Sequence, residues 1–331
     1  MSDPAAGGRP DGDRRSRVRG SMVPEAEFRS YYGRPIIKEP VWTWEVPWYF
    51  FTGGLAGASA SLGLGARLAA NHRLARSAWT VSGAAVTASV PLLVSDLGRP
   101  ERFPYMLRMF KVTSPLSVGS WILAAMAPAA AGAAVSDRLG IFPRLGRSAE
   151  TVAGLLGPAL ATYTGTLVAD TAVPVWHEAG RELPFLFAGS AAASAGAAAV
   201  LSTPAADAGP ARRLLVAGAV LELGAAQAME RRLGELGEPY HHGPAGRLAR
   251  LAKACTAAGA GLVALGGRRR RGVAAAGAAL VLAGSACERW AVYKAGFQSA
   301  RDPRYIVEPQ RARMAARDAE PSDRENAVRG E

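Results

Sequence analysis

The sequence predicts an all-α, polytopic integral membrane protein with eight transmembrane helices. Hydrophobic residues make up 49% of the 331 residues, and they gather in blocks of about twenty, enough to span a ~30 Å hydrocarbon core at ~1.5 Å per helical residue. These blocks mostly lack the polar faces at a 3.6-residue period that helices of a soluble bundle show. The mean hydropathy is only +0.07 because polar ends and arginine-rich loops dilute the blocks.

Eight apolar blocks are the predicted spans, and their even number places both chain termini on the same side of the membrane. In chain order they cover residues 46–70, 77–95, 117–135, 150–171, 183–202, 211–229, 247–266 and 272–295. The last two give the weakest signal because they are rich in alanine and glycine. Residues 1–40 are predicted to form a disordered or extended arm, because they lack apolar periodicity. Residues 301–331 are predicted to form a charged, disordered tail.

The first block combines a ladder of small residues with an aromatic entrance. Small residues recur every four positions, on one helical face, where they let helices approach closely in lipid; they are Gly53, Gly57, Ser61 and Gly65. Aromatic residues crowd the start of the block: Trp42, Trp44, Trp48, Tyr49, Phe50 and Phe51. Two interpretations stay open for this entrance, an interfacial aromatic belt and the mouth of a site for a flat, amphipathic molecule.

The connection between the second and third blocks carries unusual charge. Residues 94–121 are rich in proline and hold six charged side chains, Asp96, Arg99, Glu101, Arg102, Arg108 and Lys111. So much charge at a membrane boundary is costly unless it binds a headgroup, a ligand or a partner subunit. Asp96 either pairs with Arg99 or Arg102, or handles a proton.

The net charge of +12 first suggests a protein that binds nucleic acid. The arginines, however, are scattered through loops between apolar blocks. That distribution suits anionic lipid headgroups and the positive-inside rule better. We therefore expect the lipid bilayer, and no nucleic acid, as a partner of this chain.

Metal cofactors held by this chain are not expected. The two cysteines, Cys255 and Cys287, lie inside apolar blocks, and an iron–sulfur cluster held by one chain needs about four thiolates. The histidines fall in predicted loops, at His72, His177, His241 and His242. Haem b in a membrane anchor needs axial histidines within the spans, so neither haem nor a cluster is expected here.

Ionisable residues in or beside the predicted spans are functional candidates, because charge at membrane depth is costly. Glu45 lies at the mouth of the first block and Asp96 closes the second, while Asp170 and Glu222 lie in the fourth and sixth. A carboxyl group in a low dielectric can carry a proton, so Asp96, Asp170 and Glu222 are the proton-handling candidates. For each of the three a structural or interfacial role is the alternative, which leaves the assignment open.

Two further groups of polar residues lie in the fourth and the last predicted spans. Tyr163, Thr166 and Asp170 are spaced three and four residues apart, which predicts one shared helical face. A tyrosine hydroxyl on such a face can hydrogen-bond a carbonyl oxygen. Glu288 and Arg289, in the last block, are expected to be structural.

Several segments of the chain resemble the NrfD/PsrC family, the integral membrane subunits of molybdopterin and iron–sulfur oxidoreductases such as polysulfide reductase. They are WEVPWYFFTGGLAG at 44–57, SDLGRPERF at 95–103 and TSPLSVGSW at 113–121. The segment YTGTLVADTAVPVWHEAGRELPF at 163–185 resembles the fourth span and the following loop of family members. The resemblance extends over about residues 31–303.

The resemblance implies an eight-helix domain at 41–300, built as two four-helix bundles at about 46–171 and 183–295. It implies menaquinone or ubiquinone bound near the first bundle, with Tyr163, Trp44 and Glu45 as the quinone-binding residues. It further implies no haem, a prokaryotic cytoplasmic membrane, and electron exchange with a four-cluster ferredoxin-like iron–sulfur subunit. A molybdopterin catalytic subunit often lies beyond that partner.

These observations together predict a membrane anchor without catalytic residues of its own that binds quinone or quinol. The charged loop would dock the iron–sulfur partner through Arg99, Glu101, Arg102, Arg108 and Lys111. One alternative is a proton-coupled secondary transporter using Glu222 and Asp170, although the sequence shows only weak helix breaks and no convincing repeat. Another alternative is a purely structural anchor that binds no quinone.

Overall fold

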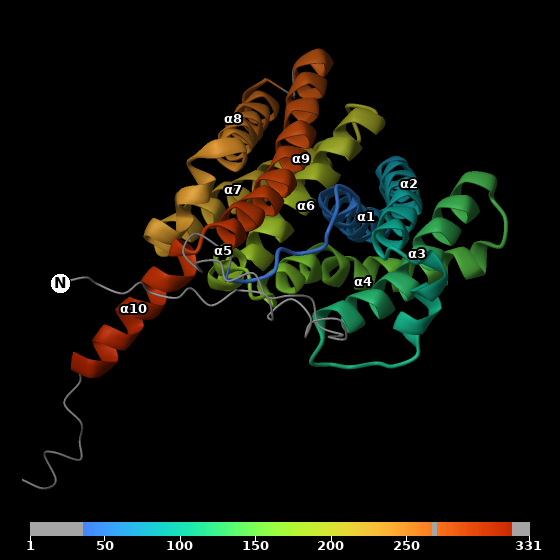
Figure 1. The fold of residues 1–331 in the computed structure, drawn as a ribbon. Helices are drawn as coiled ribbons and strands as arrows, with labels where there is room; N and C mark the ends of the chain where they lie inside the picture. Colours follow the sequence, from blue (N-terminus) through green and yellow to red (C-terminus); the bar gives the residue numbers. More distant parts are fainter. Residues whose placement is uncertain (1–35, 267–269, 320–331) are drawn as a thin grey trace, which may run out of the picture. The chain divides into compact units, whose positions relative to one another are not determined.

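The computed structural model describes residues 36–266 and 270–319, and every regular element in these ranges is helical. Ten α-helices and three 3-10 helices follow one another in these ranges without a strand between them (Figure 1). The all-α prediction is therefore confirmed. Most of the predicted N-terminal arm, residues 1–35, and the end of the predicted tail, residues 320–331, lie outside the described residues.

Eight long helices take the places of the eight apolar blocks. They are α1 (Glu45–Leu68), α2 (His72–Asp96), α3 (Pro115–Leu139), α4 (Pro143–Ala169), α6 (Leu183–Ser202), α7 (Gly209–Leu233), α8 (Gly243–Leu265) and α9 (Arg271–Arg301). Five of these, α2, α3, α4, α6 and α8, are long and apolar enough to cross a membrane. Glycine and serine in α1, and ionisable residues in α7 and α9, lower the hydropathy of the other three. The eightfold crossing thus stays a prediction.

Local sequence signals explain where these helices begin and end. Proline stands in the first turn of α3, α4, α6, α7 and α8, where its missing N–H has no helical partner to lose. The Asn71 side chain caps α2 by accepting a hydrogen bond from the Leu74 N–H at 3.1 Å. Gly140 ends α3 in the left-handed conformation, at φ 69°, which glycine adopts without strain.

Short helices fill the connections, and one of them corrects an expectation. They are η1 (Pro100–Leu107), α5 (Pro174–Glu178), η2 (Ala179–Arg181), η3 (Gly234–Tyr240) and α10 (Arg304–Ala319). The prediction of a disordered tail is wrong for 304–319, which form α10. Its first turn is held to η3, because Arg304 Nη2 lies 2.6 Å from Glu238 Oε2. This hydrogen bond from Arg304 lowers the pKa of the Glu238 carboxyl below its ordinary value.

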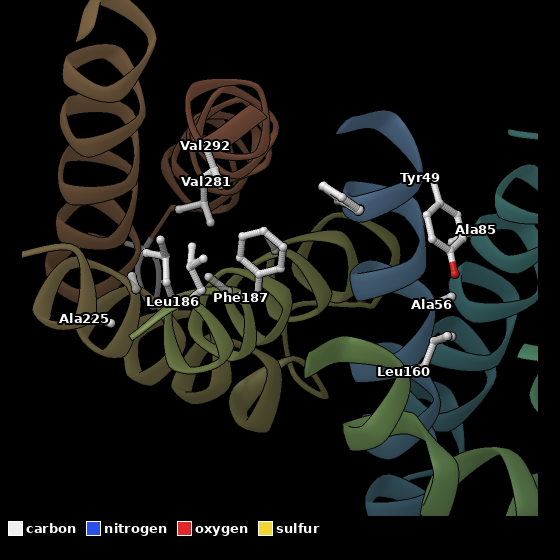
Figure 2. Packing of buried hydrophobic residues seen from close by; sticks show 14 of the residues in the cluster. Tyr49, Ala56, Ala85, Leu160, Leu186, Phe187, Ala225, Val281 and Val292 are labelled. Atoms are coloured by element: carbon white, nitrogen blue, oxygen red, sulfur yellow. The ribbon is translucent and has the colours of Figure 1, made fainter. Parts of the chain in front are cut away.

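Helix contacts follow the chain order closely. α1 packs against α2 and α4, and α3 packs against the same two helices. α6 packs against α7 and α9, and α8 against α9 and α7. α6 also contacts α1 and α4, so the division into two four-helix bundles stays a prediction. Figure 2 shows buried side chains in both groups, with Tyr49, Ala56, Ala85 and Leu160 in one and Leu186, Phe187, Ala225, Val281 and Val292 in the other.

One close helix contact is between α1 and α4, which run antiparallel. A Cβ added to Gly57 would collide with the Gly157 carbonyl oxygen, and a Cβ on Gly157 would collide with the Gly57 carbonyl. One turn further along α1, the Ser61 hydroxyl donates to the Gly154 carbonyl oxygen at 3.0 Å. The small-residue ladder is therefore a helix contact at Gly57 and Ser61. At Gly65 an added Cβ would meet no atom within 4 Å.

We predict that Gly57→Ala destabilises the protein by about 1–3 kcal/mol, the usual cost of overpacking, because the methyl group forces α1 and α4 apart. Gly65→Ala is the matched control on the same helix and should leave stability equal or slightly higher, since alanine favours helix over glycine. Thermal unfolding in one detergent checks both variants. Equal midpoints for Gly57→Ala and the native protein would contradict the contact.

Candidate functional site

Two buried tyrosines meet where α1 faces α4. The hydroxyl groups of Tyr49 and Tyr163 are in hydrogen-bond contact, and the residues are only 2% and 9% exposed. The Tyr163 ring lies directly against α3, where a Cβ on Gly119 would collide with it. Tyr163 is therefore held between three helices with its hydroxyl paired to Tyr49. Sequence reasoning did not assign Tyr49 to the site and placed it only among the entrance aromatics. Its position four residues after Glu45, one turn deeper on the same helical face, could have identified it.

Two carboxylates come together at the start of α1. The Thr43 backbone N–H and hydroxyl lie 3.0 and 2.9 Å from Asp96 Oδ1, and the same hydroxyl contacts Glu45 Oε2. Thr43 thus links Glu45, the first residue of α1, to Asp96, the last residue of α2. Within the described ranges no ion pair joins Asp96 to Arg99 or Arg102, the first of the two interpretations left open for Asp96, and its carboxylate is bound by Thr43.

The entrance tryptophans divide into outward and inward side chains. Trp44 and Trp48 are 58% and 38% exposed, as residues of an interfacial belt would be. Trp42 instead stacks on Trp176 with ring centroids 5.3 Å apart, and its carbonyl oxygen accepts a hydrogen bond from the Tyr293 hydroxyl at 2.8 Å. Trp42 therefore fastens the segment before α1 to α5 and α9, while Trp44 lies at the outer rim of the entrance.

Tyr163, Thr166 and Asp170, which were expected to share one helical face, differ in exposure. Tyr163 is buried, whereas Thr166 and Asp170 are exposed. α4 ends at Ala169 and Asp170 is its C-terminal capping residue. The exposed side chains of Thr166 and Asp170 therefore take no part in the buried tyrosine pair.

A second polar cluster, the buried triad, consists of Glu222, Glu288 and Arg289. Their exposed fractions are 2%, 6% and 1%. Arg289 Nε lies 3.5 Å from Glu288 Oε2, while Arg289 Nη2 donates to the Phe187 carbonyl oxygen at 2.9 Å. The guanidinium also lies 3.7 Å from the centre of the Phe187 ring, a cation–π contact. Glu222, a proton-handling candidate from the sequence, thus lies beside Glu288 and Arg289, which were expected to be structural.

The buried triad is incompletely hydrogen-bonded. The Thr256 hydroxyl donates to Glu222 Oε1 at 3.1 Å, but Glu222 Oε2 and both Glu288 carboxyl oxygens have no hydrogen-bond partner among the described residues. Both residues line a cavity of about 30 Å³, which is room for a water molecule. Glu230 and Lys253 line the same cavity and form an ion pair at 2.5 Å. The two buried carboxyl groups therefore share one cavity with the Glu230–Lys253 ion pair of α7 and α8.

The charged loop folds as η1 and stays at the surface. Each predicted docking residue is exposed: Arg99, Glu101, Arg102, Arg108 and Lys111. Large apolar side chains are exposed beside them, with Met109 and Val112 at 75% and Phe110 at 60%. The end of the loop is fixed to α3, because the Met109 carbonyl oxygen accepts a hydrogen bond from Trp121 Nε1 at 3.3 Å. A surface that mixes charge and large apolar side chains suits a protein or membrane contact.

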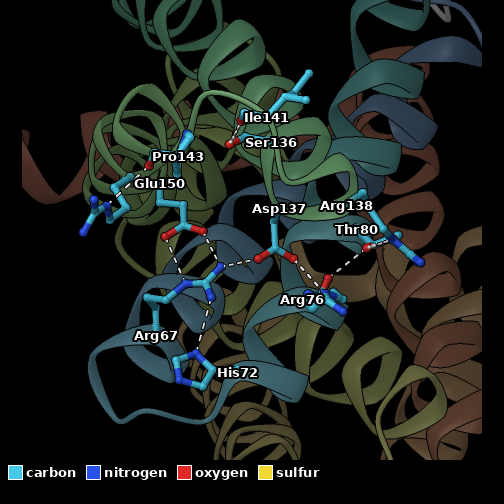
Figure 3. A network of polar contacts seen from close by, with 11 residues as sticks. Arg67, His72, Arg76, Thr80, Ser136, Asp137, Arg138, Ile141, Pro143 and Glu150 are labelled. Atoms are coloured by element: carbon cyan, nitrogen blue, oxygen red, sulfur yellow. Dashed lines mark hydrogen bonds and ion pairs between the residues drawn. The ribbon is translucent and has the colours of Figure 1, made fainter.

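An ion-pair network closes the opposite end of the first four helices (Figure 3). Arg67 at the end of α1 contacts both carboxyl oxygens of Glu150, at 3.1 and 2.6 Å, and Asp137 at 2.5 Å. Asp137 also pairs with Arg76 at 3.2 Å. Sequence reasoning missed this network because its members come from four helices and share no spacing. In the described ranges, no three histidine, cysteine, aspartate or glutamate side chains gather as ligands of a metal ion.

Comparison with known proteins gives one family. The family model described as "Polysulphide reductase, NrfD" matches residues 37–231, more than half of the chain. The match runs from the segment before α1 into the last turns of α7, so it includes the tyrosine pair, the Glu45–Asp96 pair and the charged loop. No curated protein matches the chain.

We predict that Arg289→Gln destabilises the protein by about 3–5 kcal/mol, because it leaves buried carboxylates without a compensating charge. Adding Glu288→Gln should recover part of the loss. Arg301→Gln is the control on the same helix, since the Arg301–Glu39 pair is exposed and should cost no more than about 1 kcal/mol. Unfolding midpoints in detergent compare the three variants, and equal losses for Arg289→Gln and Arg301→Gln would contradict the buried triad.

Proposed function

The chain belongs to the NrfD family of membrane subunits of oxidoreductase complexes, and on this basis we propose that it binds quinone or quinol and exchanges electrons with an iron–sulfur partner. Its long apolar helices identify an integral membrane protein. The proposed location is the prokaryotic cytoplasmic membrane. The observation that carries the proposal is the buried Tyr49–Tyr163 pair beside the Glu45–Asp96 carboxylates.

All eight long helices are proposed to cross the bilayer, as two four-helix bundles. Two of the helices that fall short in hydropathy, α7 and α9, carry ionisable residues that are buried in the structure. Glu222 of α7 and Glu288 and Arg289 of α9 are each less than a tenth exposed, so they present little charge to lipid. This burial reduces the cost of placing α7 and α9 at membrane depth.

The quinone head is proposed to bind at the tyrosine pair. A quinone carbonyl oxygen needs a hydrogen-bond donor, and the Tyr163 hydroxyl is such a donor inside an otherwise apolar helix contact. The carbonyl oxygen would replace the Tyr49 oxygen as the acceptor of that hydrogen bond. Glu45 lies one turn above Tyr49 on α1, and Trp44 would border the entrance through which menaquinone or ubiquinone arrives.

Oxidation of a quinol releases two electrons and two protons, which must leave by different routes. The electrons would pass to a cluster of a four-cluster ferredoxin-like subunit, and a molybdopterin subunit would hold the catalytic site beyond it. The protons would pass to the Glu45–Asp96 pair, since Asp96 accepts hydrogen bonds only from Thr43 among the described residues. Asp170 and Glu222 lie away from the tyrosine pair and would serve only a further proton step.

The docking surface for the iron–sulfur partner is proposed to be η1 and its flanks. The loop begins directly after Asp96, so a partner bound there would lie close to the entrance of the quinone site. Its exposed charges, Arg99, Glu101, Arg102, Arg108 and Lys111, would set the orientation of docking. The exposed Met109, Phe110 and Val112 would supply the apolar area.

We predict that Tyr163→Phe raises the KM for quinol by up to about tenfold in the assembled complex, because a neutral hydrogen bond contributes ~0.5–1.5 kcal/mol. The ring stays in place, so the helix contact is kept. Quinol-linked electron transfer measured at several quinol concentrations separates KM from kcat.

The matched control is Tyr240→Phe, which removes a hydroxyl from a buried tyrosine whose hydroxyl has no hydrogen-bond partner in the described part of the chain. It should leave the quinol kinetics unchanged. Unchanged turnover and quinol affinity in Tyr163→Phe would remove Tyr163 from the site. Assembly of a complex without any bound quinone would favour a structural anchor, and substrate uptake without an iron–sulfur partner would favour a transporter.

A further inference from the structure

A basic pocket of about 330 Å³ lies at the start of α2, the end of this helix away from the charged loop. Its principal lining residues are His72, Arg73, Arg76, Thr80, Val81 and Arg138, and the end of α6 closes it at Ser202. All residues that line it belong to the described part of the chain, and none of them is acidic. The pocket therefore presents three arginines and a histidine to one space.

The arginines of the basic pocket are held in position by their neighbours. Arg76 donates through Nε to Asp137 Oδ2 at 3.2 Å, and Asp137 is itself held by Arg67 at 2.5 Å. Arg138 donates through Nε to the Thr80 hydroxyl oxygen at 3.2 Å. Figure 3 shows both contacts at the edge of the ion-pair network. Because each contact uses Nε, the two terminal nitrogens of each guanidinium are left without a hydrogen-bond partner among the described residues.

The backbone adds to the positive potential of the basic pocket. α2 begins at His72, after the capping residue Asn71, so the positive end of its helix dipole lies at the pocket. Backbone N–H groups and arginines that converge on one space form an anion site. Guanidinium groups match the oxygens of a phosphate, to which they can donate two parallel hydrogen bonds.

The position of the basic pocket favours a phospholipid over a soluble anion as its ligand. α2 and α3 are both apolar enough to cross a membrane, and the pocket lies where α2 starts and α3 ends, which is headgroup level. Val81 lines the pocket on its deeper side, and Val135 and Leu139 of α3 are exposed at 49% and 67%. The site is thus polar toward the water and apolar toward the bilayer, as a phospholipid is.

We propose that the basic pocket binds the phosphate of an anionic phospholipid headgroup, with the acyl chains along α2 and α3. Basic pockets between transmembrane helices are the usual sites for such headgroups. A lipid here would contact α2, α3 and α6, because residues of all three helices line the pocket. α2 and α6 are also joined there directly, since the Ser77 hydroxyl donates to the Ser202 carbonyl oxygen at 3.0 Å. The proposal requires that α2 and α3 span the membrane and is independent of the quinone site.

The test uses the full chain, purified in detergent and stripped of lipid. Binding is followed as the rise of the unfolding midpoint when phosphatidylglycerol or phosphatidylcholine is added in mixed micelles. Phosphatidylglycerol should stabilise the protein more than phosphatidylcholine. The double variant Arg76→Gln/Arg138→Gln should weaken its apparent affinity at least about tenfold, one decade in the dissociation constant. The control Arg144→Gln/Arg147→Gln removes two exposed arginines from the start of α4, outside the pocket, and should bind as the native protein does.

Equal affinity in the Arg76/Arg138 variant and the native protein, or an equal loss in the control, would overturn the proposal. Inorganic phosphate that competes as well as phosphatidylglycerol would show a soluble anion site and overturn the assignment to lipid. Where the glutamine variant does not fold, Arg76→Lys/Arg138→Lys keeps the charge but cannot donate two parallel hydrogen bonds, so it should bind phosphatidylglycerol more weakly than the native protein, and equal affinity would overturn the proposal. Native mass spectrometry of the native chain provides the second readout, and retention of phosphatidylglycerol no greater than that of phosphatidylcholine would also contradict the site.

Discussion

The close approach of α1 and α4 is the constraint on which the rest of the structure depends. Glycine faces glycine at Gly57 and Gly157, so the two backbones touch without side chains between them. This contact fixes the register of an antiparallel pair whose ends carry the polar groups. Tyr49 meets Tyr163 toward one end, and Arg67 meets Glu150 at the other. A shift of one residue would rotate either helix by about 100° and would separate both pairs.

Two of the buried polar sites differ in where they lie and in the groups that they contain. The tyrosine pair and the carboxylates Glu45 and Asp96 lie among α1, α2 and α4, beside the surface proposed to dock the partner. The buried triad lies among α6 to α9, with carboxyl oxygens that no described residue satisfies. A buried carboxylate without a full set of donors is costly. In the proposed function, quinone binding therefore belongs to the tyrosine pair, and a further proton step that uses Glu222 would belong to the buried triad.

Features that depend on local sequence pattern could be predicted from the sequence. Contacts that depend on how distant helices are rotated against each other could not. The long helices and the exposed charged loop followed from block length and from charge placement, both of which are local. The pairing of Tyr163 with Tyr49, and of Glu288 and Arg289 with Glu222, depends on which faces of distant helices meet, and spacing within one helix does not specify that. The exposure of Asp170 agrees with the interfacial role that the sequence left open for it, because α4 ends one residue before it. α10 was missed because its sequence is rich in charged residues and contains Pro309.

The quinone site between α1 and α4 is tested most directly by photolabelling the assembled complex with an azido-quinone and mapping the labelled peptides. We expect label on peptides that contain Tyr49 or Tyr163, and we expect excess native quinone to suppress it. Label confined to peptides of α6 to α9, or label that native quinone does not displace, would contradict a quinone site at the tyrosine pair.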